Sequence, residues 1–213
     1  PDVTKFRYTY GTQISYDTGL LKLTGEAYGQ SGDDANRNDI SAYMWALDVA
    51  HSRNRVQLHA GYTFLSGGSP GDDNPAGNVF NTLYATNHKF YGTMDYFLNI
   101  GADTRNGGLQ NIYAGADFQF SESLSLKTDL HYFALAENIR NPLNPTGELL
   151  DKSLAVEIDN QLRYTFDKDV QIHFGYSALF ADNALEAIQS RPDAKDVQHW
   201  LWAMLEITPE FLK

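Results

Sequence analysis

Residues 154–166 read Leu154-Ala155-Val156-Glu157-Ile158-Asp159-Asn160-Gln161-Leu162-Arg163-Tyr164-Thr165-Phe166. Side chains alternate here between an apolar row (Leu154, Val156, Ile158, Leu162, Tyr164, Phe166) and a polar row (Glu157, Asp159, Gln161, Arg163, Thr165). A period of two places the two rows on opposite faces of a β-strand. Residues 167–169 then turn the chain into a second alternating stretch, 170–180. This part of the sequence therefore predicts an antiparallel β-hairpin.

About nine such strands are expected along the chain. They cover residues 6–16, 21–30, 40–52, 56–65, 111–120, 124–136, 154–166 and 170–180, and a last strand has an apolar row from Leu201 to Phe211. Short turns alternate with long connections, as in a barrel with one rim toward the periplasm and the other toward the exterior. The connection at about 66–109 is too long for an ordinary hairpin loop, and its aromatic middle, 80–97, is expected to contain a short helix or one more strand.

Composition narrows the possible classes of protein. The chain has 213 residues, which we interpret as a single domain over 1–213, and it contains no cysteine. Its mean hydropathy of -0.42 and short apolar runs exclude a membrane-spanning helix, so a place in a membrane requires a barrel. The net charge of -11 argues against nucleic acid as a partner.

The apolar rows favour a membrane barrel over a soluble sheet. Aromatic side chains gather near the strand ends, as in the interfacial girdles of membrane barrels: Tyr16, Tyr62, Phe64, Phe118, Phe120, Tyr164, Phe166, Tyr176 and Phe180. Nine strands would close only a narrow barrel, so we expect about half of an eighteen-stranded antiparallel transmembrane β-barrel, with the other half upstream. The alternative is a soluble β-sheet protein, either a ligand binder or a surface adhesin, in which the apolar rows form a closed core.

One block within the long connection carries a family resemblance. It reads Phe80-Asn81-Thr82-Leu83-Tyr84-Ala85-Thr86-Asn87-His88-Lys89-Phe90-Tyr91-Gly92-Thr93-Met94-Asp95-Tyr96-Phe97. This block, together with residues 61–68 and 6–11, resembles the alginate export family of outer-membrane porins. The resemblance implies an eighteen-stranded barrel in the bacterial outer membrane, of which this chain is the C-terminal half. It also implies a polar lumen that passes a uronic-acid polysaccharide or smaller solutes.

Charged and histidine side chains of the polar rows and of the aromatic block are the expected pore lining. They are Arg7, Lys22, Glu26, His59, His88, Lys89, Asp117, Lys127, Asp129, His131, Glu157, Asp159, Arg163 and His173. Acids outnumber bases on the strand faces, so a lumen lined by these faces alone would repel alginate. Expected partners are outer-membrane lipid, a saccharide or small solute, and the upstream half of the barrel.

Four aromatic side chains are candidates for stacking on sugar rings: Tyr91, Tyr96, Trp200 and Trp202. Residues 87–91 fit an inward-folded constriction, or alternatively an ordered loop packed on the barrel wall. Trp200 and Trp202 fit a stacking platform, an interface anchor or a contact with the missing half.

Metal and catalytic sites are not expected. His59, His131 and His173 lie on different strands, so they are interpreted as hydrogen-bonded lumen residues rather than metal ligands. The carboxylates Asp129, Glu157 and Asp159 have the chemistry of a glycosidase pair but fit solvation and selectivity better. The acidic loops 33–34 and 72–74 lack the spacing of an EF-hand and are interpreted as solvated. We therefore expect no enzyme, no cofactor and no bound metal.

Overall fold

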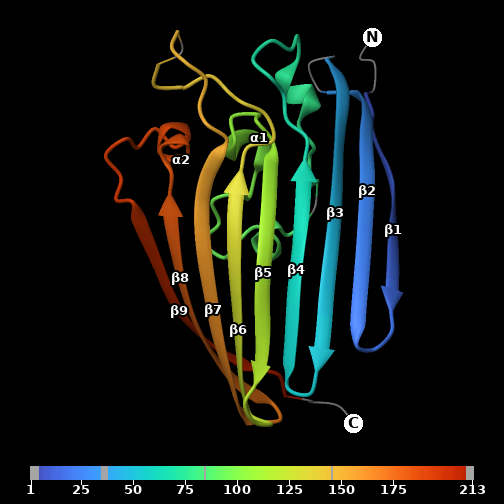
Figure 1. The fold of residues 1–213 in the computed structure, drawn as a ribbon, viewed down its shortest axis with the longest axis vertical. Coiled ribbons are helices and arrows are strands. Elements are labelled where there is room, and N and C mark those ends of the chain that lie inside the picture. Colours follow the sequence, from blue (N-terminus) through green and yellow to red (C-terminus); the bar gives the residue numbers. More distant parts are fainter. Residues whose placement is uncertain (1–4, 35–37, 84, 145, 210–213) are drawn as a thin grey trace.

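The computed structural model describes residues 5–34, 38–83, 85–144 and 146–209. These residues form one nine-stranded antiparallel sheet in which each strand pairs with its neighbour in sequence (Figure 1). The strands are β1 (Arg7–Asp17), β2 (Leu21–Asp33), β3 (Asp39–Arg53), β4 (Val56–Leu65), β5 (Leu109–Gln119), β6 (Leu124–Ala134), β7 (Ser153–Asp167), β8 (Val170–Ala181) and β9 (Val197–Ile207). The predicted fold class and the predicted number of strands are confirmed. Phe211, where the last apolar row was expected to end, lies outside the described residues.

Tight turns close the hairpins at one end of the sheet and long connections lie at the other, as Figure 1 shows. In the β1–β2 turn, the amide of Gly19 donates to Asp17 Oδ1 at 2.7 Å. Gly19 has φ +83°, which suits a residue without a Cβ. In the β3–β4 turn, Asn54 takes φ +55°, a region that asparagine tolerates better than most residues. The turn residues thus fix the register of the hairpins.

The apolar rows share one face of the sheet, called here the outer face, and they remain exposed on it. Leu201 is 75% exposed, Phe166 72% and Ile14 70%. Aromatic rings contact one another on this face: the centroids of Trp45 and Tyr62 lie 4.8 Å apart and those of Tyr43 and Phe64 5.7 Å apart. A soluble sheet with a closed core would bury such rows, whereas a membrane barrel presents them to lipid.

The long connection 66–108, called here the inward segment, folds back onto the opposite face, called the inner face (Figure 1). Its ends meet, because Gly68 N donates to Asn106 O at 2.8 Å. It contains two 3-10 helices, η1 (Pro75–Asn78) and η2 (Asn87–Lys89), and one turn of α-helix, α1 (Ile100–Asp103). Within the predicted range 80–97, η2 meets the expectation of a short helix, and the described residues of that range form no further strand. A second α-helix, α2 (Asn183–Ile188), lies in the β8–β9 connection.

None of the helices within the described residues is long and apolar enough to cross a membrane.

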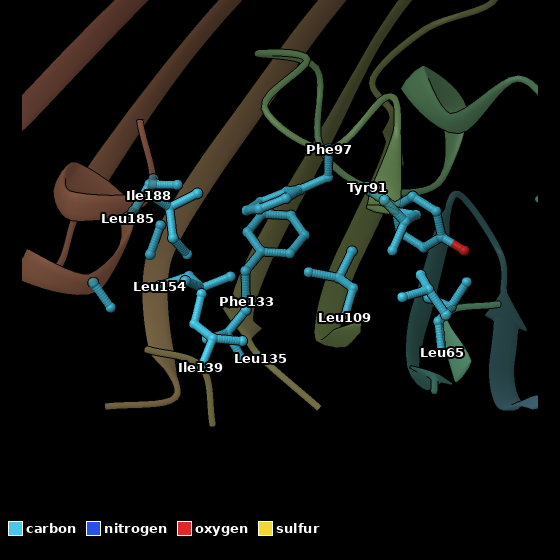
Figure 2. Packing of buried hydrophobic residues seen from close by; sticks show 14 of the residues in the cluster. Leu65, Tyr91, Phe97, Leu109, Phe133, Leu135, Ile139, Leu154, Leu185 and Ile188 are labelled. Carbon is cyan, nitrogen blue, oxygen red and sulfur yellow. The ribbon is translucent and has the colours of Figure 1, made fainter. Parts of the chain in front are cut away.

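A dry apolar cluster joins the inward segment and α2 to the inner face near the long-connection end. Figure 2 shows Phe97 packed on Phe133, and their ring centroids lie 4.7 Å apart. The cluster also contains Leu65 and Leu109 from neighbouring strands, and Leu185 and Ile188 from α2. Dispersion and apolar burial here hold the inward segment on the sheet.

Leu154 departs from the predicted alternation. It was placed in the exposed apolar row, yet it is fully buried in this cluster. The β6–β7 register shifts at this point, because Phe133 pairs with Ala155 and Ala134 with Ser153, so Leu154 has no partner on β6. An extra residue in one strand redirects its side chain, which explains why a strict period of two is wrong here.

Candidate functional site on the inner face

The inward segment is tied to the inner rows of β7 and β8 through Thr93 and Met94. Met94 N donates to Glu157 Oε1 at 2.9 Å, and Thr93 N donates to Asp159 Oδ2 at 3.3 Å. The Thr93 hydroxyl donates to Asp159 Oδ1 at 2.5 Å. Its oxygen is also 2.6 Å from Ser177 Oγ, which is then the donor. Two carboxylates of one strand therefore bind two consecutive amides of the segment.

Gly92 makes this approach possible. It has φ +78°, and a Cβ at this position would come within 2.6 Å of the Glu157 carboxylate. Any other residue would be strained in its backbone and would also collide with the group that holds Met94. Glu157 itself is 0% exposed, so the segment covers it.

Two further ties hold the segment on other strands. Gln30 of β2 donates from Nε2 to Asn81 O at 2.7 Å and accepts from Asn81 N at 2.9 Å. Asn111 of β5 donates from Nδ2 to Phe90 O at 3.1 Å, and His131 Nδ1 lies 3.0 Å from Asn111 Oδ1. The segment thus crosses the inner face from β2 to β8, with side chains of the sheet bound to its backbone.

A charged hollow of about 710 Å³ lies between the segment and strands β1–β6. Its lining includes three lysines and four acids: Lys22, Lys89, Lys127, Glu26, Asp48, Asp117 and Asp129. His59 Nε2 donates to Asp129 Oδ1 at 2.6 Å, and Lys127 Nζ is 3.1 Å from Asp129 Oδ2. The Tyr113 hydroxyl donates to Asp48. Lys127 and Asp129 thus form an ion pair, and the lining as a whole carries charges of both signs.

An aromatic hollow of about 910 Å³ lies on the other side, between the segment and strands β7–β9. Trp200 and Trp202 of β9 line it together with Met94 and Tyr96 of the inward segment. The polar groups of its lining are His88, Asp95, Asp103, Gln161, Gln189, Gln198 and His199, with Thr93 beside them. Three of the four predicted stacking residues are therefore brought to one hollow.

Three solved structures of outer-membrane Occ porins share this fold. They are OccAB4 of Acinetobacter baumannii (TM-score 0.55, 10% identity, 94% of this chain and 45% of that chain) and OccK5 of Pseudomonas aeruginosa (0.55, 13%, 94% and 50%). The third is OccK3 of Pseudomonas aeruginosa (0.52, 14%, 93% and 49%). This chain has the fold of half an outer-membrane porin. It spans about half the length of the three porins.

The porin fold agrees with the outer-membrane location expected from the sequence. No protein-family model matches the chain, and no curated protein matches it either. The comparisons thus support the outer-membrane porin fold that the family resemblance implied, but they do not single out the alginate export family.

The predicted pore-lining residues are distributed over three hollows and further positions on the inner face. Those in the charged hollow are Lys22, Glu26, His59, Lys89, Asp117, Lys127, Asp129 and His131. His88 lies in the aromatic hollow, where its Nδ1 is 2.5 Å from Asp95 Oδ1. Arg163 and His173 line a smaller hollow nearer the hairpin turns. Arg7 is exposed on the inner row of β1.

Three predictions of accessible site residues need correction. Glu157 and Asp159 were expected to face open lumen, but the inward segment covers both and uses their oxygens. Neither is available to a substrate as half of a glycosidase pair. Tyr91 was expected to stack on sugars, but its side chain is only 6% exposed because it packs in the apolar cluster.

The histidines and acidic loops considered for metal binding stand apart from one another in the described part of the chain. There, no three His, Asp or Glu side chains lie close enough to share an ion. His59, His131 and His173 stand on β4, β6 and β8 and are not brought together. In the acidic loop 72–74, which was interpreted as solvated, Asp72 Oδ2 accepts from Ser69 N at 2.7 Å and from Asn78 Nδ2 at 2.8 Å, so it closes its own turn.

The residues that hold the segment were missed from the sequence. Gly92 and Thr93 lie in no periodic pattern, and Gln30 and Ser177 look like ordinary members of the polar rows of their strands. The available signal was the length of the connection, since a long loop in a compact domain usually has a function or a structure of its own.

Proposed function

We propose that this chain forms about half of the wall of an outer-membrane channel for small solutes, together with the segment that narrows its lumen. The observation that carries the proposal is the inward segment, which lies across the polar inner face and is bound through its backbone to β2, β5 and β7 and through the Thr93 hydroxyl to β8. On the opposite face the apolar rows are exposed. A membrane barrel has this arrangement, with lipid outside and water inside.

Small solutes fit better than a polyanionic polysaccharide. The charged hollow has four acids against three lysines, so it offers no net attraction to a chain of uronic acids. The inward segment also reduces the cross-section that a polymer must thread. Export of alginate, as the family resemblance implied, is therefore the second candidate, and it would require a strongly basic lining in the remainder of the barrel.

The unpaired edges of β1 and β9 indicate that the sheet is part of a larger barrel. Among the described residues, β1 pairs with β2 alone and β9 pairs with β8 alone, so the outer edge of each carries an unpaired row of backbone groups. Unpaired backbone groups cost several kcal/mol each in lipid, roughly, which is why membrane sheets close into barrels. We infer that β1 and β9 pair with further strands of the same protein.

Planar-bilayer conductance of the full-length protein tests the proposed function. We expect discrete conductance steps in salt solution and slowed current in the presence of polyethylene glycols small enough to enter the lumen. A protein that inserts into the bilayer and passes no current would contradict the channel. A protein that stays monodisperse in plain buffer would contradict the membrane location itself, because its exposed apolar rows require detergent or lipid.

A further inference from the structure

The inner row of β9 contains two tryptophans, whereas the inner rows of β6 and β7 carry several charged side chains each. This row contains Gln198, Trp200, Trp202, Met204 and Glu206. Trp200 is 53% exposed, so much of its ring is free of contacts within the described chain. Tryptophan on a water-facing row of a barrel has no lipid to bury against, and therefore its apolar surface is available to a ligand.

The Trp202 ring lies flat on the wall because its cross-strand partner is Gly175. A Cβ at position 175 would come within 2.1 Å of Trp202 Cε2 and Nε1. One face of the indole therefore covers the backbone of β8, and the other face is turned toward the aromatic hollow that the ring lines. Because the ring is held in place before a ligand arrives, little side-chain entropy is lost when the ligand binds.

The opposite wall of the hollow is also held in place. Met94 and Tyr96 line it from the inward segment, and Met94 N is bound to the buried Glu157. Tyr96 packs in addition against the apolar cluster. The hollow therefore has aromatic and thioether surfaces on two sides, each supported by the sheet.

The polar groups of the hollow are amides and a histidine–aspartate pair. Gln161, Gln189 and Gln198 contribute amide groups, and His88 is bound to Asp95 at 2.5 Å. Among the described residues that line the hollow there is no lysine and no arginine. An anionic ligand would therefore meet acids without a counter-charge, whereas an uncharged ligand with many hydroxyls would meet donors and acceptors.

We propose that the aromatic hollow is a binding site for uncharged saccharides. The inference rests on the proposed channel function and names the class of solute that this side of the lumen takes. The C–H faces of a pyranose ring lie on Trp200 and Trp202, and its hydroxyls exchange hydrogen bonds with the glutamine amides and Asp95. The volume of about 910 Å³ falls within the range of roughly 300–1,000 Å³ found for small-molecule sites, so a short oligosaccharide fits.

The test is block of single-channel current in the full-length protein by maltotriose, compared with the trimer of galacturonic acid. We expect maltotriose to block current in a saturable manner and the anionic trimer to block far less. In Trp200→Ala/Trp202→Ala the dissociation constant for maltotriose should rise about tenfold or more, because the stacking surface is lost. Trp45→Ala, on the outer face, is the matched control and should leave the block unchanged.

A glycine substitution tests the geometry without the removal of any aromatic ring. Gly175→Ala displaces the Trp202 ring and should also weaken the block by maltotriose, whereas Gly25→Ala meets nothing within 4 Å and should not. Binding is measured in parallel by tryptophan fluorescence in detergent, since two of the three tryptophans lie in the hollow.

The outcomes separate this inference from the channel function. Normal conductance without maltotriose block, or block that both tryptophan substitutions leave intact, would overturn the saccharide site and leave the channel standing. Absence of conductance together with a saturable fluorescence change on addition of maltotriose, which Gly175→Ala weakens and Gly25→Ala does not, would keep the binding site and overturn the channel. Equal block by both trimers would refute the preference for uncharged sugars.

Discussion

Single residues decide whether the inward segment can lie on the sheet, and Gly92 is the most constrained of them. In Gly92→Ala a side chain must adopt φ +78° and also lies within 2.6 Å of the Glu157 carboxylate. A left-handed backbone costs a non-glycine residue about 1–2 kcal/mol before the collision is counted. We expect the segment to detach at residues 92–94, with faster cleavage by protease in detergent and a larger channel conductance.

The matched control for this prediction is Gly101→Ala in α1. A Cβ there meets nothing closer than 3.6 Å, and alanine favours a helix over glycine by about 0.8–1 kcal/mol. Protease cleavage and conductance should therefore stay at the level of the unmodified protein. Equal sensitivity of the two variants would mean that the contact with Glu157 does not hold the segment.

The hydroxyl of Thr93 is the second residue-scale determinant. Thr93→Val keeps the shape of the side chain but removes the hydrogen bonds to Asp159 and Ser177. Because Asp159 stays buried, the loss should be about 1–3 kcal/mol, at the level of a buried polar group left unsatisfied. Unfolding in urea from detergent micelles should show a lower midpoint, and open-channel noise should increase. Thr12→Val, on the outer row of β1, should change neither.

At the scale of elements, four glycines in the strands are covered by aromatic rings from the neighbouring strand. Direct cross-strand pairs join Gly11 to Tyr28, Gly29 to Tyr10, Gly61 to Tyr113 and Gly175 to Trp202. In each pair a Cβ on the glycine would come within 2.8 Å of the ring. The ring replaces the missing side chain and protects the ladder beneath it, so these glycines do not weaken their strands as isolated ones would.

The two faces of a strand should differ in their tolerance of charge. Leu162 and Gln161 are neighbours on β7, with Leu162 on the outer face and Gln161 lining the inner hollows. Leu162→Arg should destabilise the barrel by up to about 2–4 kcal/mol, the cost of arginine near the bilayer midplane, whereas Gln161→Arg should be nearly neutral. Reversible unfolding from lipid vesicles measures both. A larger loss for Gln161→Arg would reverse the assignment of the faces.

Strands could be predicted from the sequence far better than the segment could. Each strand carries a local period of two, so its two faces can be assigned without knowledge of its partners. The inward segment instead depends on contacts such as that between Met94 and Glu157, which lie on separate strands and loops and leave no local pattern. Glu157 and Asp159 were placed on the correct face, but their burial depends on a segment whose position the sequence alone does not reveal.

At the scale of the whole molecule, the inward segment behaves as an insert in a sheet that is complete without it. Ten residue pairs from Val56–Phe118 to Leu65–Leu109 join β4 to β5. The ends of the segment already touch, since Gly67 and Gly107 are in close contact and Gly68 is bound to Asn106. Removal of the middle of the segment should therefore leave a short connection between strands whose register is already fixed.

Deletion of residues 69–105 tests this view of the molecule. We expect the protein to assemble as a barrel with a clearly larger conductance, because the obstruction across β2–β8 is gone. Stability should fall, since Phe133 loses its contact with Phe97 and Glu157 loses Met94. Heat-modifiable migration in gels reports assembly, and planar bilayers report conductance. If the shortened barrel assembles with unchanged conductance, the segment does not narrow the lumen. If it fails to assemble, Thr93→Val and Gly92→Ala carry the same test, because they loosen the segment while leaving the full chain in place.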